Sequence, residues 1–203
     1  KTDGTLWKWE YKTVPTQVGT DNDWAFVSAG GGLIVAIKTN GTLWELAKGE
    51  SIPRQIGTDK DWAFVSTSGS HTLAIKKNGT LWAWGSNSYG QLGLGTTVPV
   101  DIPTQVGFDY DWVYVSAGPR HTMAIKSNGT LWGWGNNFFR QVGPFFDTVI
   151  LTPRQIGTDA NWAIVSCGEY HTVALKTNGV LYSWGWGPHG ELGLGEDITY
   201  TLY

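Results

Sequence analysis

Apolar and polar residues alternate in short runs along this chain, and each run is broken by an Asn-Gly pair. In residues 71–85, HTLAIKKNGTLWAWG, β-branched and aromatic side chains alternate with small or polar ones on both sides of Asn78-Gly79. A period of two predicts β-strands, and Asn-Gly is the strongest short signal for a tight hairpin, typically with a type I′ turn. The same pair of strands is predicted again at 34–44, 121–135 and 171–185.

A second block precedes each hairpin. Its copies are PTQVGTDNDWAFVSAG (15–30), PRQIGTDKDWAFVSTSG (53–69), PTQVGFDYDWVYVSAG (103–118) and PRQIGTDANWAIVSCG (153–168). Each copy contains a Pro-led strand and a short apolar strand, and proline suits the start or the outer edge of a sheet. We therefore predict units of four short antiparallel strands: the apolar strand (A), the hairpin (B and C) and the Pro-led strand (D). A Gly-rich excursion lies between C and D, and no helix is predicted.

Four-stranded units that repeat at about 40–50 residues are typical of a β-propeller. We predict an all-β fold, a β-propeller with about four blades of four antiparallel strands in this chain. Residues 1–203 are interpreted as one array, in which a partial unit at 1–14 is followed by repeats at 15–52, 53–102, 103–152 and 153–203, the last one truncated. The paired tryptophans of strand C, such as Trp82 and Trp84, are predicted to pack between adjacent blades.

Composition narrows the function classes. The net charge is −3 and only 15% of the 203 residues are charged, so no nucleic-acid-binding surface is predicted. No run of about 18 apolar residues occurs, so no membrane insertion is predicted. The single cysteine, Cys167, aligns with Ala29, Thr67 and Ala117, and it is interpreted as a small core residue.

Several motifs that suggest chemistry have structural interpretations. Asp pairs such as Asp59/Asp61 lack the glycine and the glutamate of a calcium loop, so we interpret them as caps of turns. The Asn-Gly-Thr triplets match a glycosylation acceptor, but the hairpin turn accounts for them without a glycan. The GQLGLG stretch lacks the Lys-Ser/Thr of a phosphate loop. No metal ligand, cofactor or catalytic residue is predicted.

The stretch HTLAIKKNGTLWAWGSNSYGQLGLG (71–95) resembles the repeat of the regulator of chromosome condensation family, whose motif runs GxxHTxAL, a hairpin and then WGxNxxGQLG. The resemblance covers essentially the whole chain in register. It implies a propeller that usually has seven blades, in a family that includes a nucleotide-exchange factor for a nuclear GTPase, a bacterial inhibitor of β-lactamases and many bacterial and phage proteins. The chain is similar to a bacterial or phage-like member with a partial array, for which an extracellular or virion-associated location is favoured over a cytoplasmic one.

The resemblance also bears on the repeated histidine. His71, His121 and His171 recur at one repeat position without clustered carboxylates, so structural hydrogen bonds are expected, as in the family, rather than a metal site. No insertion of the kind that the exchange factor uses is visible, and no basic tail for chromatin is present in the sequence. Neither of those two activities is therefore expected of this chain.

Strand order sorts the loops onto two faces. The B–C hairpins and the D–A loops share one face and are nearly uniform, whereas the A–B loops and the C–D excursions share the other face and vary. Varied loops on a uniform scaffold suit a recognition surface, and drift of unconstrained loops explains the variation equally well. Arg140 stands in the third excursion where the others have Gly90 and Gly190, which predicts a changed turn or strain.

Aromatic and charged side chains of the variable face are the candidate partner-binding residues, because aromatic and arginine side chains anchor protein interfaces. They are Tyr89, Arg120, Phe138, Phe139, Arg140, Phe145, Phe146, Glu169, Tyr170, Trp186 and His189. The four phenylalanines could equally form a private packing cluster. We predict a non-enzymatic binding or assembly module, whose partner is a protein or further copies or blades that complete the propeller. Exchange-factor-like or enzymatic activity at the channel mouth, and carbohydrate binding, are the alternatives.

Overall fold

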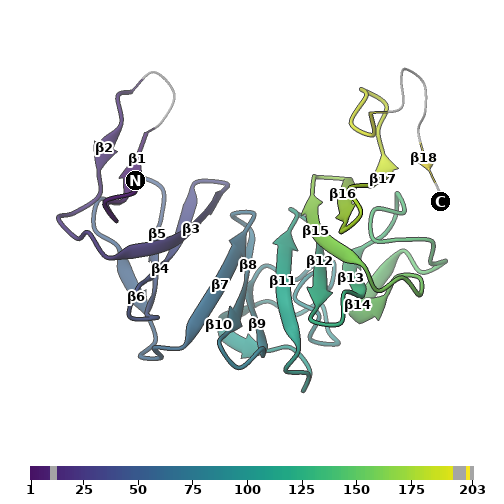
Figure 1. Cartoon of the computed structure of the whole chain (residues 1–203), viewed down its shortest axis with the longest axis horizontal. Helices are drawn as coiled ribbons and strands as arrows, with labels where there is room; N and C mark the ends of the chain where they lie inside the picture. The colour runs from purple at the N-terminus through teal and green to yellow at the C-terminus, as the bar shows by residue number, and fades with distance from the viewer. Residues whose placement is uncertain (10–12, 194–199, 202–203) are drawn as a thin grey trace.

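The computed structural model describes residues 1–9, 13–193 and 200–201 of the chain. Four four-stranded antiparallel sheets follow one another along an arc, and a two-stranded sheet precedes the first of them (Figure 1). The described residues contain no helix, and hence none that is long and apolar enough to cross a membrane. The predicted all-β fold of four-stranded propeller blades is confirmed.

The four sheets are blades 1 to 4, and each has the strand order A-B-C-D. Blade 1 contains β3 (Trp24–Gly30), β4 (Leu33–Lys38), β5 (Leu43–Leu46) and β6 (Arg54–Ile56). Blade 2 contains β7 (Trp62–Thr67), β8 (His71–Lys76), β9 (Leu81–Gly85) and β10 (Val100–Gln105). Blade 3 contains β11 (Trp112–Ala117), β12 (His121–Lys126), β13 (Leu131–Asn136) and β14 (Val149–Gln155). Blade 4 contains β15 (Trp162–Cys167), β16 (His171–Lys176), β17 (Leu181–Trp186) and β18 (Tyr200–Thr201), and the two-stranded sheet pairs β1 (Trp7–Lys8) with β2 (Thr16–Gln17). The Pro-led strand thus closes the blade that precedes it in the sequence.

The B–C hairpins do not have the type I′ turn that Asn-Gly predicted. Gly79 has a φ of 80°, but Asn78 has no positive φ. The Gly79 N–H donates to the Lys76 carbonyl and the Lys76 N–H donates to the Thr80 carbonyl, which defines a type I turn followed by a left-handed glycine. The Asn78 side chain explains the difference, because its Oδ1 accepts from both the N–H and the hydroxyl of Thr80, at 3.1 and 2.7 Å.

This turn also orients the first tryptophan of strand C. The Thr80 hydroxyl accepts from Nε1 of Trp82 at 3.0 Å, so that asparagine, threonine and tryptophan form one chain of hydrogen bonds. Blades 1 and 3 repeat it. In blade 4 the corresponding residues are Val180 and Tyr182, so the hydroxyl and the indole are lost together.

The Asp pairs before strand A were predicted to cap turns, and the structure shows that they bind a lysine of strand B instead. In blade 2, Lys76 Nζ lies 2.6 Å from Asp59 Oδ2 and 3.2 Å from Asp61 Oδ1. The ammonium also lies 4.9 Å from the centre of the Trp62 ring and 4.7 Å from that of Trp82. Burial by itself lowers the pKa of Lys76, but the hydrogen bonds to the two carboxylates outweigh it and raise this pKa above its usual value. The lysine is therefore held in its charged form.

Neighbouring blades are joined through the second tryptophan of strand C. Trp134 is fully buried, and its Nε1 donates to the carbonyl of Gln91 in blade 2 at 2.9 Å. Trp184 donates in the same way to the Val142 carbonyl of blade 3, at 3.3 Å. The first tryptophan of the pair packs mainly within its own blade, where the Trp82 and Trp62 ring centroids lie 6.0 Å apart. The prediction of inter-blade packing therefore holds for the second member of the pair.

The A strands of adjacent blades lie against one another. The Ser66 hydroxyl of β7 accepts from the N–H of Ala117 in β11 at 3.0 Å, and the Ser28 hydroxyl of β3 accepts from the N–H of Thr67 at 3.0 Å. A Cβ on Gly30 would lie 2.7 Å from the carbonyl carbon of Ser68. This close approach explains why the repeated A strand ends in small residues.

We call the two carboxylates and two indole rings around Lys76 the lysine cage, and we expect it to contribute to stability. Replacing Lys76 by Met leaves two carboxylates without their cation, so we expect the free energy of unfolding to fall by about 1–3 kcal/mol. Lys77 is the next residue and is exposed, so Lys77→Met is the matched control and should change it by no more than about 0.5 kcal/mol. Urea unfolding measures both variants, and equal losses would contradict a specific role for the cage.

Candidate functional site

The A–B loops and the C–D excursions lie together on one face of the arc. The N–H of Ser86 donates to the Ser70 carbonyl, that of Asn136 to Arg120 and that of Trp186 to Tyr170, each at 2.9 Å. These bonds hold the start of every excursion against the A–B loop of its own blade. We call this surface the loop face, and it consists of the A–B loops 68–70, 118–120 and 168–170 and the excursions 86–99, 136–148 and 186–193.

Aromatic side chains from blades 3 and 4 form a cluster on the loop face. Phe139 stacks on Trp186 with a centroid distance of 5.1 Å and an interplanar angle of 18°. The Tyr170 ring stands edge-on to both, with centroids 5.2 Å from Phe139 and 5.5 Å from Trp186. Phe138 packs edge-on to Phe139 at 5.0 Å, and the His189 ring lies 6.4 Å from that of Trp186. We call these five side chains the aromatic cluster.

Arg120 connects the aromatic cluster to blade 2. Its Nη1 donates to the Tyr170 hydroxyl at 2.5 Å, and its guanidinium lies 4.9 Å from the Tyr170 ring centre and 5.5 Å from that of Tyr89. Glu169 Oε1 lies 4.0 Å from its Nη2. Hydrogen bonding to Glu169 is the main cause that raises the pKa of the Tyr170 hydroxyl above its usual value, so the hydroxyl stays protonated. The row from Tyr89 to Trp186 therefore crosses three blades.

Arg140 takes the left-handed conformation of the glycine that it replaces. Its φ is 61°, which is the only positive φ of a non-glycine residue in the described part of the chain. Its N–H donates to the Asn137 carbonyl at 3.0 Å, as that of Gly90 donates to Asn87, so the turn is retained. Such a conformation costs about 1–2 kcal/mol for a residue with a Cβ. The guanidinium lies 5.7 Å from the Phe146 ring, outside the aromatic cluster.

The four phenylalanines in the excursion of blade 3 have different environments. Phe145 is half-buried against the core, and the Arg154 guanidinium lies 4.9 Å from its ring. Phe139 belongs to the aromatic cluster. Phe138 and Phe146 are 67% and 94% exposed. In this excursion Phe145 and Phe139 pack against other parts of the structure, whereas Phe138 and Phe146 are largely exposed to solvent.

Buried amide side chains that were not among the sequence candidates shape the excursions. The Oδ1 of Asn137 accepts from the N–H groups of Val142 and Gly143, and its Nδ2 donates to the carbonyls of Phe145 and Asp147. Asn87 and Gln91 in blade 2 repeat the positions of Asn137 and Gln141 in blade 3. Their repetition in the sequence is the signal that could have identified them.

Two histidines and the cysteine, which have nucleophilic or metal-binding potential, are engaged in packing. His71 and His121 are fully buried, and burial lowers the pKa of each to about 3. Burial raises the pKa of the Cys167 thiol to about 12, and this thiol donates to the Ser116 carbonyl at 3.2 Å. In the part of the chain that the structure describes, no three His, Cys, Asp or Glu side chains are grouped as metal ligands.

The buried histidines predict a loss of stability in acid. Both stay neutral in the folded protein, whereas in the unfolded chain they take up protons near pH 6.5, so stability falls as the pH decreases from about 7 toward 3. The slope grows as the unfolded chain takes up protons, and it reaches about 1.4 kcal/mol per pH unit for each histidine well below pH 6.5. Urea unfolding between about pH 7 and pH 5 measures it, a range in which most carboxylates stay ionised. A double variant, His71→Gln with His121→Gln, should lose most of this slope, and an unchanged slope would assign the acid sensitivity to other groups.

The repeats of this chain match a known family of sequence repeats. Two sequence profiles, both described as the regulator of chromosome condensation (RCC1) repeat, match the chain. One matches residues 78–125 and 128–175, and the other matches 62–91, 112–141 and 162–191. No curated protein sequence matches the chain.

Solved structures with the same fold include Prp20, the yeast RCC1. Its complex with Kap60 has a TM-score of 0.81 and 22% identity, over 92% of this chain and 49% of that one. A structure of Prp20p from Saccharomyces cerevisiae, described with its binding properties to Gsp1p and histones, has a TM-score of 0.82 and 22% identity, over 92% and 51%. Human WBSCR16 has a TM-score of 0.80 and 19% identity, over 92% and 54%. The chain thus spans about half the length of these proteins, and the likeness shows the fold.

Proposed function

We propose a function on the basis that the chain belongs to the regulator of chromosome condensation (RCC1) repeat family. In this proposal the chain is a non-enzymatic module whose loop face binds a protein. The observation that carries the proposal is the row of Tyr89, Arg120, Tyr170, Phe139 and Trp186, which crosses three blades. Tyrosine, tryptophan and arginine are the side chains that most often dominate protein–protein binding energies.

The geometry of the row supports this role. Its rings are already packed against one another, so little side-chain entropy is lost when a partner covers them. Phe138, which packs edge-on against Phe139 of the row, is 67% exposed and offers apolar area to a partner. Glu169 lies beside Arg120 at the edge of the row, and protein interfaces typically combine a packed centre with a polar rim.

The fold relatives support a protein partner over a small-molecule substrate. Yeast RCC1 was crystallised with Kap60, and its binding to Gsp1p and histones is described. These partners belong to that protein, whereas for this chain we propose only the class of partner. Further blades or copies that complete a propeller are the second class, which the open arc of four blades suggests (Figure 1).

Two acidic side chains of the loop face, Glu169 and Glu191, support binding rather than catalysis. Glu169 lies beside Arg120 and Tyr170. Glu191 accepts from the N–H of His189 at 2.8 Å, and backbone hydrogen bonds lower its pKa below the usual value, so it is an ionised acceptor within its own turn. Carbohydrate binding is disfavoured, because Phe139 covers one face of the Trp186 ring and Arg120 lies over the Tyr89 ring.

Site-specific photo-crosslinking tests the proposal. A photo-reactive amino acid at position 138 on the loop face should capture a discrete protein in producing cells. The same group at position 108, where Phe108 is 95% exposed in a D–A loop on the opposite face, should not capture it. The captured protein is then purified and its affinity for the chain is measured.

The double variant Arg120→Ala with Phe138→Ala should weaken binding of that protein by about tenfold or more, because hot-spot side chains contribute about 2 kcal/mol or more each. The control Phe108→Ala should stay within about twofold, and melting temperatures verify that both variants fold. Unchanged affinity of the double variant, or an equal loss in the control, would contradict the proposed surface.

A further inference from the structure

A single buried hydroxyl ties each of two blades to the blade before it. Thr122 in β12 of blade 3 donates through Oγ1 to the Gln91 carbonyl in the excursion of blade 2, at 2.8 Å. Nε2 of His71, in strand B of blade 2, lies 2.9 Å from Oγ1 of Thr122. A hydroxyl has one hydrogen, and it is used toward Gln91, so His71 must be the donor to Thr122. We call this arrangement the His–Thr–Gln bridge.

The bridge recurs between blades 3 and 4. Thr172 donates to the Gln141 carbonyl at 2.7 Å and accepts from Nε2 of His121 at 3.0 Å. All six side chains of the two bridges are essentially buried. A glycine of strand C makes room for the glutamine, because a Cβ on Gly135 would lie 3.3 Å from the Gln91 Cα, and one on Gly185 would lie 3.2 Å from the Gln141 Cα.

The glutamine of each bridge holds an aromatic residue of the loop face. Oε1 of Gln91 accepts from the N–H of Tyr89, and Oε1 of Gln141 accepts from the N–H of Phe139, each at 2.9 Å. Tyr89 contacts Arg120, and Phe139 contacts Tyr170. Each bridge therefore links the buried histidine of one blade, through the threonine of the next blade and the glutamine of the excursion, to the backbone N–H of an aromatic residue of the binding row.

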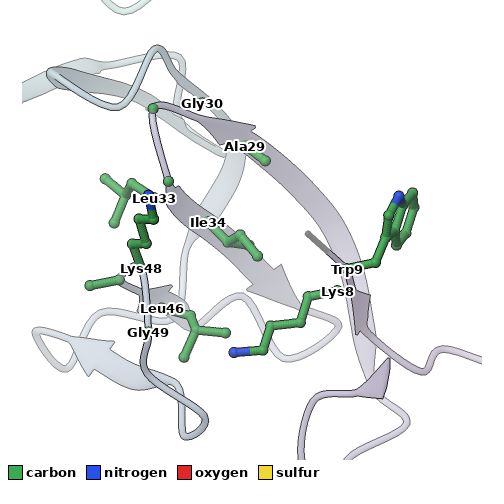
Figure 2. A pocket seen from close by; sticks show the side chains of 12 residues that line it. Lys8, Trp9, Ala29, Gly30, Leu33, Ile34, Leu46, Lys48 and Gly49 are labelled. Atoms are coloured by element: carbon green, nitrogen blue, oxygen red, sulfur yellow. The ribbon is translucent and has the colours of Figure 1, made fainter. Parts of the chain in front are cut away.

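Blade 1 shows what the molecule looks like without a bridge. Leu33 and Ile34 occupy the positions of the histidine and the threonine (Figure 2). The strands β5 and β6 are joined by the short segment 47–53 in place of an excursion. Thr72 of blade 2, which would receive the histidine, donates to the Thr67 hydroxyl at 3.0 Å instead.

The boundary between blades 1 and 2 is nevertheless well packed. Val35, Ile37, Trp62 and Trp84 are buried in one cluster there. Blades therefore stack without the bridge, and the bridge is found where an excursion must be placed.

We propose that Thr122 and Thr172, with the histidines that donate to them, are positioning residues that set the excursions of blades 2 and 3 and thereby orient Tyr89 and Phe139 for the partner. The importance of this role for binding rests on the proposed function of the loop face. The positioning itself does not, because it is a statement about the order of two excursions in the free protein.

Isosteric variants test the proposal by hydrogen exchange. Thr172→Val removes the hydroxyl and keeps the volume, and it should make the Phe139 amide exchange about five- to tenfold faster while the Tyr89 amide stays unchanged. Thr122→Val should do the reverse. Thr72→Val is the matched control, because it removes a buried hydroxyl at the same repeat position that serves no excursion, and it should change neither amide.

A merely structural role for these hydroxyls would give a different result. It would speed exchange throughout the affected blades, or equally in the Thr72→Val control, and either result would overturn the proposal, as would unchanged exchange in both excursions. His121→Gln keeps an N–H donor toward Thr172, so it should retain more Phe139 protection than His121→Leu. If these results hold while the variant Arg120→Ala with Phe138→Ala leaves partner affinity unchanged, the positioning stands and the proposed binding surface fails.

Discussion

The contact between neighbouring blades is the interaction on which the rest of the structure depends. Strands of two to seven residues form sheets too small to be stable alone, and each sheet buries its faces only when another packs on it. Indoles such as Trp134 supply the apolar area, and hydrogen bonds such as Ser66 to Ala117 set how closely the A strands approach. The core is therefore a series of equivalent layers along the arc, in which each blade supplies one wall.

The binding row is a product of the same contact. The excursions of blades 2 and 3 each leave strand C of one blade and rest on the next blade, where Thr122 and Thr172 respectively receive them. This places Tyr89 of blade 2 beside Arg120 of blade 3, and Phe139 of blade 3 beside Tyr170 of blade 4. A surface that no single repeat contains thus arises because each repeat overlaps its neighbour.

Much of the fold follows from local sequence signals. Period-two alternation and Asn-Gly located the hairpins, and repetition gave the blades and their strand order. The turn type could not be read in this way, because the Asn78 side chain accepts from Thr80 and the backbone settles in another geometry. The lysine cage was missed for a related reason: Asp59 and Lys76 lie 17 residues apart, and only the folded blade brings them together.

The candidate site was predictable as a face and not as a set of contacts. Strand order assigned the excursions and the A–B loops to one surface. Strand order could not distinguish Phe145, which packs against the core, from Phe146, which is exposed. Two identical neighbouring residues in a loop do not indicate which of them is buried. Strand order also could not foresee that Arg120 lies between two tyrosines, because that contact depends on the spacing of three blades.

The serine bonds between A strands have a consequence for how such an array changes during evolution. The bond from Thr67 to Ser28 spans 39 residues, whereas those from Ala117 to Ser66 and from Cys167 to Ser116 span 51, yet all three measure 3.0 Å. The approach of successive A strands is thus independent of the amount of sequence looped out between them. Duplication of a repeat, or loss of an excursion, is therefore compatible with the same contact between A strands, whereas a bulkier residue in place of one serine would disrupt that contact.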